Sequence, residues 1–303
     1  MTARAPSLPG QLSQNAARPS RFRVDPATVL RYFGLLLAAV VMLLPLYYLI
    51  YIAISAPGQE FDFPPGVVPD PVQPGNLWRA LEGEPTTPGN LAHYFRNSLW
   101  YAGLATLGCL VTQSIVGYAF ARLRFPGRNL LFGLTIAMLM MPFVVTLIPR
   151  FLFFKELHLT DSLWPLIIPW WFGGSPYGIF LMRQFFMSIP RELDEAARID
   201  GMGHWGILWR ILIPQAAPVL VALGILEGTY FWNDLLGPLI YTQSDSIKPL
   251  SLGVFFHGRN AFSINYWLFF SIIVLMVLPI ALMFLALQRY FRRGFLYSGI
   301  GGR

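Results

Sequence analysis

Six long apolar stretches limit what this 303-residue chain can fold into more than any other feature of its sequence. A helix needs about 20 predominantly apolar residues to cross the hydrocarbon core of a bilayer. Five of the stretches contain no Asp, Glu, Lys or Arg, and the remaining one contains two acids. We therefore predict an all-α, polytopic membrane protein with six transmembrane helices, at about 32–55, 98–121, 130–149, 163–182, 214–236 and 266–287.

The composition indicates that lipid is the solvent of these stretches. Charged residues make up 12% of the chain and hydrophobic residues 55%, whereas soluble domains carry about 25% charged residues. The net charge of +7 does not point to nucleic acid, because the charges stand in short blocks between the apolar stretches. Such blocks set the orientation of a membrane protein. We expect membrane lipid, and no nucleic acid, as a partner.

Basic residues are distributed unevenly between the connecting segments. The two termini, the 122–128 link and the 183–213 loop together hold 16 Arg or Lys residues, and the opposite segments hold 6. Because basic residues concentrate on the cytoplasmic side, both termini are predicted to be cytoplasmic. The predicted organisation is a disordered tail at 1–28, a membrane domain at 29–296 with an extracytoplasmic loop at 56–97 that holds a short helix near Leu77–Leu81, and a C-terminal tail at 297–303.

The segment between the fourth and fifth predicted spans, residues 188–214, begins with the signals of a helix start. Ser188 is a suitable N-cap, and Pro190 suits the first turn, where no amide N–H is needed. Glu192, Asp194 and Glu195 follow, and acids stabilise the positive end of a helix. We therefore predict a short helix on the cytoplasmic side of the membrane.

One face of this predicted helix is apolar and shallow. Leu193, Ala196 and Ala197 share it at i, i+3, i+4 spacing, and the two alanines would let a partner approach closely. Gly201 can end the helix in a left-handed conformation. A second, aromatic-rich helix then leads to the membrane at Pro214. On periodicity alone, an ordinary amphipathic connector explains the segment as well.

The residue pattern of the same segment resembles the EAA loop of ABC importer permeases. That pattern is Glu-Ala-Ala, three residues, Gly, nine residues, Ile, one residue, Leu and Pro. It stands here as Glu195-Ala196-Ala197, Gly201, Ile211 and Pro214, with Ile213 in place of the usual Leu. The extended form, with Pro190, Glu192-Leu193 and Ile199-Asp200-Gly201, resembles the carbohydrate-uptake branch.

Three more segments resemble the maltose-type, MalG-like members of that branch. They are Trp232-Asn233-Asp234 with Pro238-Leu239 in the fifth span, Asn97-Ser98-Leu99 at the start of the second, and Gln288-Arg289-Tyr290-Phe291 with Arg293-Gly294 near the C-terminus. The resemblance covers about residues 30 to 295. It implies an ABC type I importer permease fold in a bacterial cytoplasmic (inner) membrane.

The resemblance also implies an assembly. Its other members would be a second homologous permease subunit, a cytoplasmic ATPase dimer that binds ATP and Mg, and an extracytoplasmic solute-binding protein that delivers a sugar. In such permeases the EAA helix docks into a cleft of the ATPase and receives its ATP-driven closure. Glu195 and Asp200 would orient the helix and pair with the ATPase, Ala196 and Ala197 would allow close contact, and Gly201 would set the turn.

The chain has no phosphate-binding loop of its own. Such a loop needs Gly-Lys followed by Ser or Thr, and the only lysines, Lys155 and Lys248, follow Phe154 and Ile247. We therefore expect a transport subunit that is not itself an enzyme and holds no cofactor. Energy must come from another subunit or from an ion gradient.

The gradient-driven alternative is a secondary transporter that uses Glu227 and Asp234. These acids are seven residues apart within one predicted span, so they would share a helix face. Intramembrane acids mark proton relays and ion pathways, although a structural or pathway-lining role explains this sparse pair more simply. Trp170 and Trp171 in the fourth span, and Trp232 and Asn233 beside Asp234, are the other possible pathway residues.

Nothing in the sequence predicts a catalytic or metal site. The four histidines are scattered through predicted loops without the spacing of a metal site or a catalytic triad. Cys109 is the only cysteine, so no disulfide can form within the chain. We expect Cys109 to be a small buried residue.

Overall fold

The computed structural model describes residues 25–62, 66–82, 91–258 and 265–298, and every regular element within those ranges is helical. The chain divides into two units, Met1–Tyr47 and Tyr48–Arg303, which are described separately. The helices are α1 (Pro26–Ala53), α2 (Asn76–Glu82), α3 (Leu91–Arg122), α4 (Arg128–Ala137), α5 (Phe143–Glu156), α6 (Trp164–Phe172), α7 (Pro176–Ser188), α8 (Glu192–Ile199), α9 (His204–Gly206), a π-helical stretch (Ile207–Leu212), α10 (Ile213–Gln215), α11 (Ala217–Trp232), α12 (Leu236–Tyr241), α13 (Leu250–Gly258) and α14 (Tyr266–Ser298), with 3-10 turns at Gln59–Phe61, Met138–Met140 and Asp245–Ile247.

The first unit contains most of α1, a helix of 28 residues. Asp25 precedes it, and its side chain accepts a hydrogen bond from the amide of Ala27 at 3.2 Å. The predicted N-terminal tail falls mainly on residues 1–24, which lie outside the described residues. Its boundary at residue 28 is wrong, because α1 begins at Pro26. At the other end of the chain, residues 297 and 298 belong to α14, and the rest of the predicted C-terminal tail lies outside the described residues.

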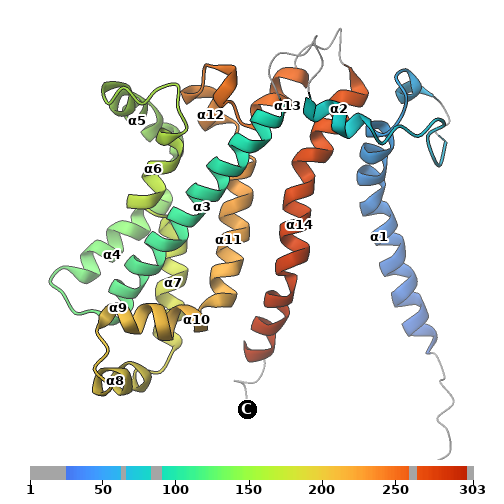
Figure 1. The fold of residues 1–303 in the computed structure, drawn as a ribbon. Coiled ribbons are helices and arrows are strands. Elements are labelled where there is room, and N and C mark those ends of the chain that lie inside the picture. Colours follow the sequence, from blue (N-terminus) through green and yellow to red (C-terminus); the bar gives the residue numbers. More distant parts are fainter. Residues whose placement is uncertain (1–24, 63–65, 83–90, 259–264, 299–303) are drawn as a thin grey trace, which may run out of the picture. The chain divides into compact units, whose positions relative to one another are not determined.

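The second unit is arranged around α3. This helix of 32 residues packs against α6, α7 and α11 (Figure 1). Glycines permit the close approach of its neighbours: a Cβ added at Gly117 would lie 2.8 Å from Cβ of Met182 in α7, and one at Gly108 would lie 2.4 Å from the Trp171 ring in α6. Small residues serve the same purpose at helix interfaces of membrane proteins in general.

Within the described residues, the helices that can cross a membrane are fewer than predicted. Three helices are long and apolar enough: α1, α3 and residues 266–288 of α14. Two further helix pairs qualify only as bent units, at 128–156 with a bend of 102° and at 204–232 with a bend of 79°. The count by length and composition is therefore three, or at most five, rather than six.

Prolines and glycines explain why two predicted spans are broken. Pro142 lies between the 3-10 turn that follows α4 and the start of α5, and proline ends a helix because it lacks an amide N–H. The predicted 130–149 span is therefore a bent pair. In the predicted 163–182 span, α6 ends at Phe172 and α7 begins at Pro176, with Gly174 at φ +60° between them.

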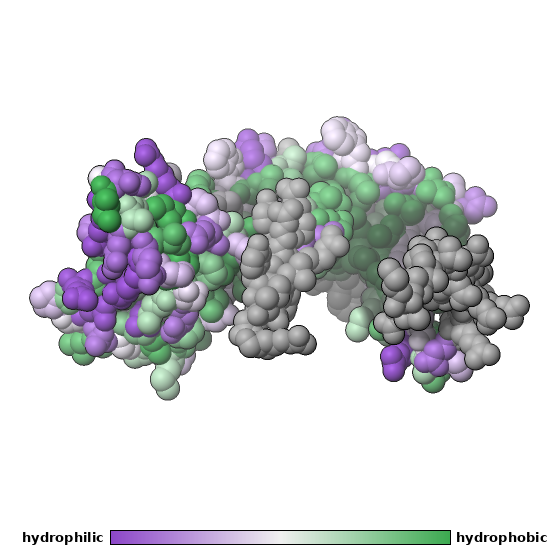
Figure 2. Space-filling view, turned by 90° about the horizontal axis from the view of Figure 1, so that it is seen from below, coloured by the Kyte–Doolittle hydropathy of each residue, from purple (hydrophilic) through white to green (hydrophobic). Residues whose placement is uncertain are grey.

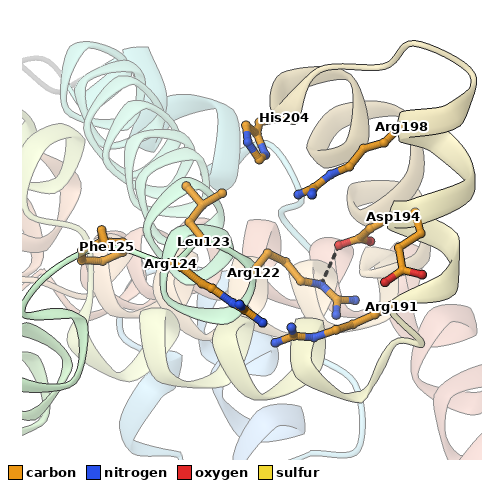
Figure 3. Close-up of a pocket in the computed structure, with 9 residues that line it drawn as sticks. Arg122, Leu123, Arg124, Phe125, Arg191, Asp194, Arg198 and His204 are labelled. Carbon is orange, nitrogen blue, oxygen red and sulfur yellow. Dashed lines mark ion pairs between the residues drawn. The ribbon is translucent and has the colours of Figure 1, made fainter.

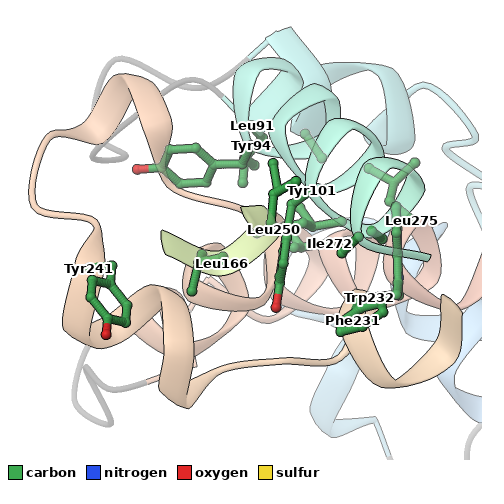
Figure 4. Close-up of a cluster of buried hydrophobic side chains, with 14 of the residues drawn as sticks. Leu91, Tyr94, Tyr101, Leu166, Phe231, Trp232, Tyr241, Leu250, Ile272 and Leu275 are labelled. Atoms are coloured by element: carbon green, nitrogen blue, oxygen red, sulfur yellow. The ribbon is translucent and has the colours of Figure 1, made fainter. Parts of the chain in front are cut away.

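Two clusters of buried apolar side chains stabilise the second unit. The first joins α3, α6, α11 and α14 and includes Tyr101, Leu166, Phe231 and Ile272 (Figure 4). The second joins the C-terminal half of α3 to α7 and to the 188–214 segment, and we call it the C-terminal cluster. Its members include Tyr118, Met182, Phe186, Ala197, Ile207, Leu208 and Leu212. Beside it, the end of the unit that carries α8 is largely hydrophilic on the face shown in Figure 2.

Candidate functional site

The helix of the 188–214 segment starts later than predicted. Ser188 is the last residue of α7, where its hydroxyl donates to the carbonyl of Phe185 at 2.7 Å, so it does not cap the next helix. Pro190 is not in a first turn either: Ile189 is extended, as expected before proline, and α8 begins at Glu192 after Arg191. The three predicted acids do lie in the first turn of α8.

The buried face of α8 differs from the predicted apolar face. Only Asp194 and Ala197 are buried, and Ala197 packs into the C-terminal cluster. Leu193 is 41% exposed and Ile199 is 88% exposed, so these apolar side chains point away from the protein. Glu195, Ala196 and Asp200 are exposed as well. Of the motif residues in α8 and just after it, Glu195, Ala196 and Asp200 thus lie on the outer surface, whereas Ala197 faces the interior of the protein.

Gly201 ends α8 in the way the sequence predicts. Its φ of +83° is in the left-handed region, which costs other residues about 1–2 kcal/mol. The amide of Gly201 donates to the carbonyl of Arg198 at 3.0 Å, and the amide of Met202 donates to that of Ala197 at 2.9 Å. This pair of bonds is a Schellman motif, which satisfies the last carbonyls of a helix. No atom lies within 4 Å of a Cβ built at Gly201, so the backbone conformation alone requires glycine there.

The second half of the segment returns to the membrane through α9, the π-helical stretch and α10. Ile207, Leu208 and Leu212 are buried in the C-terminal cluster, and Ile211 packs against it. Pro214 lies in the first turn of α10, where its missing N–H costs least. Ile211 therefore packs the segment against the protein, Pro214 is exposed in α10, and neither residue belongs to α8.

Three side-chain contacts attach this segment to the last turn of α3, and the sequence did not reveal them. Nε of Arg122 lies 3.2 Å from Oδ2 of Asp194 (Figure 3), with side chains only 2% and 9% exposed. Nη2 of Arg122 donates to the carbonyl of Ile189 at 2.8 Å, and the hydroxyl of Tyr118 lies 3.1 Å from Nδ1 of His204. A basic residue at the end of a predicted span, and an acid on the inward face of α8, are the signals that could have indicated the pair.

The two intramembrane acids do not share a helix face. Glu227 is buried in α11, and its Oε2 accepts from the thiol of Cys109, 2.9 Å away. Since α11 ends at Trp232, Asp234 lies beyond the helix, and the prediction is wrong. Oδ2 of Asp234 accepts from the hydroxyl of Tyr101 at 2.7 Å, and Oδ1 accepts from the amide of Gly237 at 3.1 Å. Cys109 is buried, as predicted.

The predicted pathway tryptophans have different surroundings. The indole of Trp232 donates to the carbonyl of Met276 in α14 at 2.8 Å, and that of Trp171 donates to the carbonyl of Leu104 at 3.0 Å. Asn233 donates to the carbonyl of Thr229 within its own turn. Trp170 lines a cavity of about 640 Å³, together with Arg150 of α5 and Gly173 and Gly174 at the α6–α7 break. Trp232 lines a second cavity, of about 410 Å³, while Trp171 and Asn233 are exposed.

These features define a class: an integral membrane transport subunit with broken spans and a short helix presented at one end. Residues 113–297 match the family model "Binding-protein-dependent transport system inner membrane component", and the chain belongs to this family. Within the described residues, no group of three or more His, Cys, Asp or Glu side chains could hold a metal ion.

The chain is similar to curated transport proteins and to a solved transporter. It is 34% identical to the arabinooligosaccharides transport system permease protein AraQ of Halalkalibacterium halodurans over 209 residues, which are 69% of this chain and 74% of AraQ. It is 32% identical to the sn-glycerol-3-phosphate transport system permease protein UgpE of Yersinia pestis bv. Antiqua over 268 residues, with coverages of 87% and 94%. A chain of a bacterial ABC transporter involved in the import of the acidic polysaccharide alginate superposes with a TM-score of 0.75 at 22% identity, covering 87% of this chain and 95% of that one.

The family resemblance read from the EAA pattern is therefore confirmed, and so is the ABC importer permease fold. The chain is a transport permease component of the membrane. The ion-gradient alternative built on Glu227 and Asp234 gains no support from these relatives.

Proposed function

We propose that this chain is one permease subunit of an ATP-driven sugar importer in a bacterial inner membrane, with both termini in the cytoplasm. Its partners would be a second homologous permease, an ATPase dimer that binds ATP and Mg, and an extracytoplasmic solute-binding protein. The names of AraQ and of the alginate transporter support a sugar substrate. The name of UgpE, which refers to a phosphorylated polyol, makes sn-glycerol-3-phosphate a useful comparison substrate.

The exposed surface of α8 is the observation that carries this proposal. Ile199 exposes 88% of its surface at the end of a helix whose first turn is acidic. A single exposed apolar side chain is ordinary on a protein surface, so the assignment uses Ile199 together with the exposed motif residues beside it. Glu195, Ala196 and Asp200 lie exposed on the same short helix, and Gly201 fixes its end. We assign this surface to the ATPase and call α8 the coupling helix.

A route for the sugar is the second part of the proposal. The cavity beside Trp170 lies where α6 is interrupted, and it combines aromatic rings with the guanidinium of Arg150. Broken helices that line a cavity are typical of transporter binding sites. We therefore keep Trp170 as a pathway residue. Trp171, Trp232 and Asn233 bond to backbone carbonyls, which favours a structural role for them.

The test uses the full complex in proteoliposomes, with arabino-oligosaccharides and sn-glycerol-3-phosphate as probes. Glu195→Ala combined with Gly201→Val should reduce uptake at least a hundredfold and abolish stimulation of the ATPase by the loaded binding protein. The variant should reach the membrane in normal amount. Glu156→Ala, an exposed acid at the end of α5 and outside the 188–214 segment, is the control and should leave both rates unchanged. Normal uptake by the double variant would contradict the proposal.

A further inference from the structure

The coupling helix makes few inward contacts of its own. Of its eight residues, only Asp194 and Ala197 are buried. Ala197 offers a single methyl group to the C-terminal cluster, and the larger apolar side chains Leu193 and Ile199 are exposed. Apart from Ala197, Asp194 is therefore the side chain of α8 that can attach the helix to the rest of the protein.

Asp194 is bound to Arg122 in the last turn of α3. The Nε–Oδ2 distance is 3.2 Å, and both side chains are more than nine-tenths buried. Among the described residues, Oδ1 of Asp194 has no hydrogen-bond partner, and Oδ2 forms the ion pair with Arg122; Arg191 and Arg198 line the same pocket. Opposite charges attract strongly in a medium of low dielectric, and removing one partner leaves an uncompensated buried charge.

Arg122 and Tyr118 hold the segment on both sides of α8. Arg122 also donates to the carbonyl of Ile189, just before the helix, and Tyr118 contacts His204, just after it. Tyr118 and Arg122 are four residues apart, so they project from one face of α3. These contacts connect movement of α8 to the C-terminal end of α3.

The rest of α3 connects that turn to the helices inside the membrane. Gly117 brings α3 into close contact with α7, where a Cβ would lie 2.8 Å from Met182. Further along α3, Cys109 bonds to Glu227 of α11, and Tyr101 bonds to Asp234 beyond it. A displacement of the end of α3 thus reaches α7 and α11 through direct contacts.

We propose that Arg122 is a positioning residue that transmits movement of the coupling helix to α3 through its ion pair with Asp194. This inference rests on the proposed function, because it takes α8 as the contact with the ATPase. Loss of the pair should leave ATP hydrolysis running while its effect on the membrane helices is lost. The number of sugar molecules imported per ATP hydrolysed is therefore the quantity that should change.

The experiment measures that ratio for the complete complex in proteoliposomes, with arabino-oligosaccharides as the probe. Arg122→Gln and Asp194→Asn should each lower the ratio at least tenfold. Arg122→Lys, which keeps the charge, should retain more than Arg122→Gln. The charge swap Arg122→Asp with Asp194→Arg should restore at least a third of the wild-type ratio. Arg124→Gln is the control, because Arg124 is exposed and lines the same pocket beside α8 (Figure 3).

The ratio does not depend on how much complex assembles, so a purely structural role gives a different result. If Arg122→Gln and Asp194→Asn lower uptake and ATP hydrolysis in proportion, the ratio stays constant and the inference is overturned. The same holds if the swap does no better than the single variants. Glu195→Ala is measured in parallel: if it uncouples the transporter while Arg122→Gln does not, the inference fails and the proposed function stands.

Discussion

The two ends of α3 hold their neighbouring segments with different chemistry. At the C-terminal end, the guanidinium of Arg122 meets the carboxylate of Asp194, and both are buried. Near the N-terminal end, neutral side chains bind the backbone of the neighbouring segment. Nδ2 of Asn97 donates to the carbonyls of Ser246 and Lys248 at 2.8 and 3.1 Å, and Oγ of Ser98 accepts from the amide of Leu250 at 2.8 Å.

This difference suggests different mechanical roles. The N-terminal end of α3 binds the backbone of the 246–250 segment at several points, which fixes its shape and its register. Asp161 adds to this by accepting hydrogen bonds from the amides of Gln243 and Ser244, each at 2.8 Å. At the C-terminal end, one buried ion pair reaches α8 itself, and two further contacts reach Ile189 and His204 on either side of it. We interpret the N-terminal contacts as a rigid platform, and the C-terminal contacts as a joint through which movement of α8 is passed to α3.

The largest loss of stability should come from a substitution that forces α3 and α7 apart near the joint. In Gly117→Val the new Cβ would lie 2.8 Å from Cβ of Met182 and 3.1 Å from the amide nitrogen of Arg183. Overpacking of this kind lowers the free energy of unfolding by about 1–3 kcal/mol. We expect a clearly lower melting temperature in detergent. Gly103→Val is the control, since nothing lies within 4 Å of a Cβ in that position on the same helix. Equal losses in both variants would contradict the close α3–α7 contact.

A more local effect is expected at the N-terminal end of α3. Asn97→Ala removes two hydrogen bonds to the 246–248 backbone, and each contributes about 0.5–1.5 kcal/mol. Amide hydrogen exchange in residues 244–250 should become faster, while the α8 segment keeps its wild-type rates. Asn129→Ala, at an exposed position in the first turn of α4, should change neither region. Faster exchange in α8 would show that the two ends are not independent.

The smallest effect should be a pH dependence at Asp161. Hydrogen bonds from Ser244, through its hydroxyl and its amide, and from the amide of Gln243 lower the pKa of the Asp161 carboxyl below its ordinary value. A depressed folded-state pKa stabilises the loop above the ordinary pKa of about 3.9, and this contribution is lost as the pH falls through the lowered pKa. Proteolysis of residues 242–244 should therefore accelerate below about pH 4.

Asp161→Asn tests whether the Asp161 carboxyl is the source of this pH dependence. Asparagine tolerates the left-handed conformation found there, with φ at 59°, and its side-chain carbonyl can accept the same amide bonds. The variant should lose the acid sensitivity and keep most of the protection at neutral pH. An unchanged pH profile in Asp161→Asn would mean that another group controls this loop.

The sequence predicted the parts of the molecule that depend on local chemistry. Apolar runs located the membrane helices approximately, the acids were correctly placed in the first turn of α8, and Gly201 was correctly predicted to end it. The short helix expected near Leu77–Leu81 is α2. A local pattern sufficed in these cases because propensity, the helix dipole and backbone conformation act over a few residues.

Errors arose where a distant contact or a single backbone break decided the outcome. The sequence alone could not show that Asp194 pairs with Arg122, 72 positions earlier, or that Ser188 continues α7. Pro142 and Gly174 convert apolar runs that are long enough to cross the membrane into bent or interrupted helices. Because α11 ends at Trp232, the periodicity that placed Asp234 on the same helix face as Glu227 did not apply.

The most direct test of the account is whether α8 touches the ATPase. The chain has one native cysteine, Cys109, and it is fully buried, so a cysteine introduced by Ile199→Cys can be labelled selectively with a maleimide photocrosslinker. In the assembled complex, irradiation should join this position to the ATPase subunit, and the yield should change when ATP with vanadate traps the closed dimer. Val67→Cys, 84% exposed on the loop predicted to be extracytoplasmic, should capture no ATPase. If position 199 captures no ATPase, or position 67 captures as much, the coupling role of α8 is contradicted.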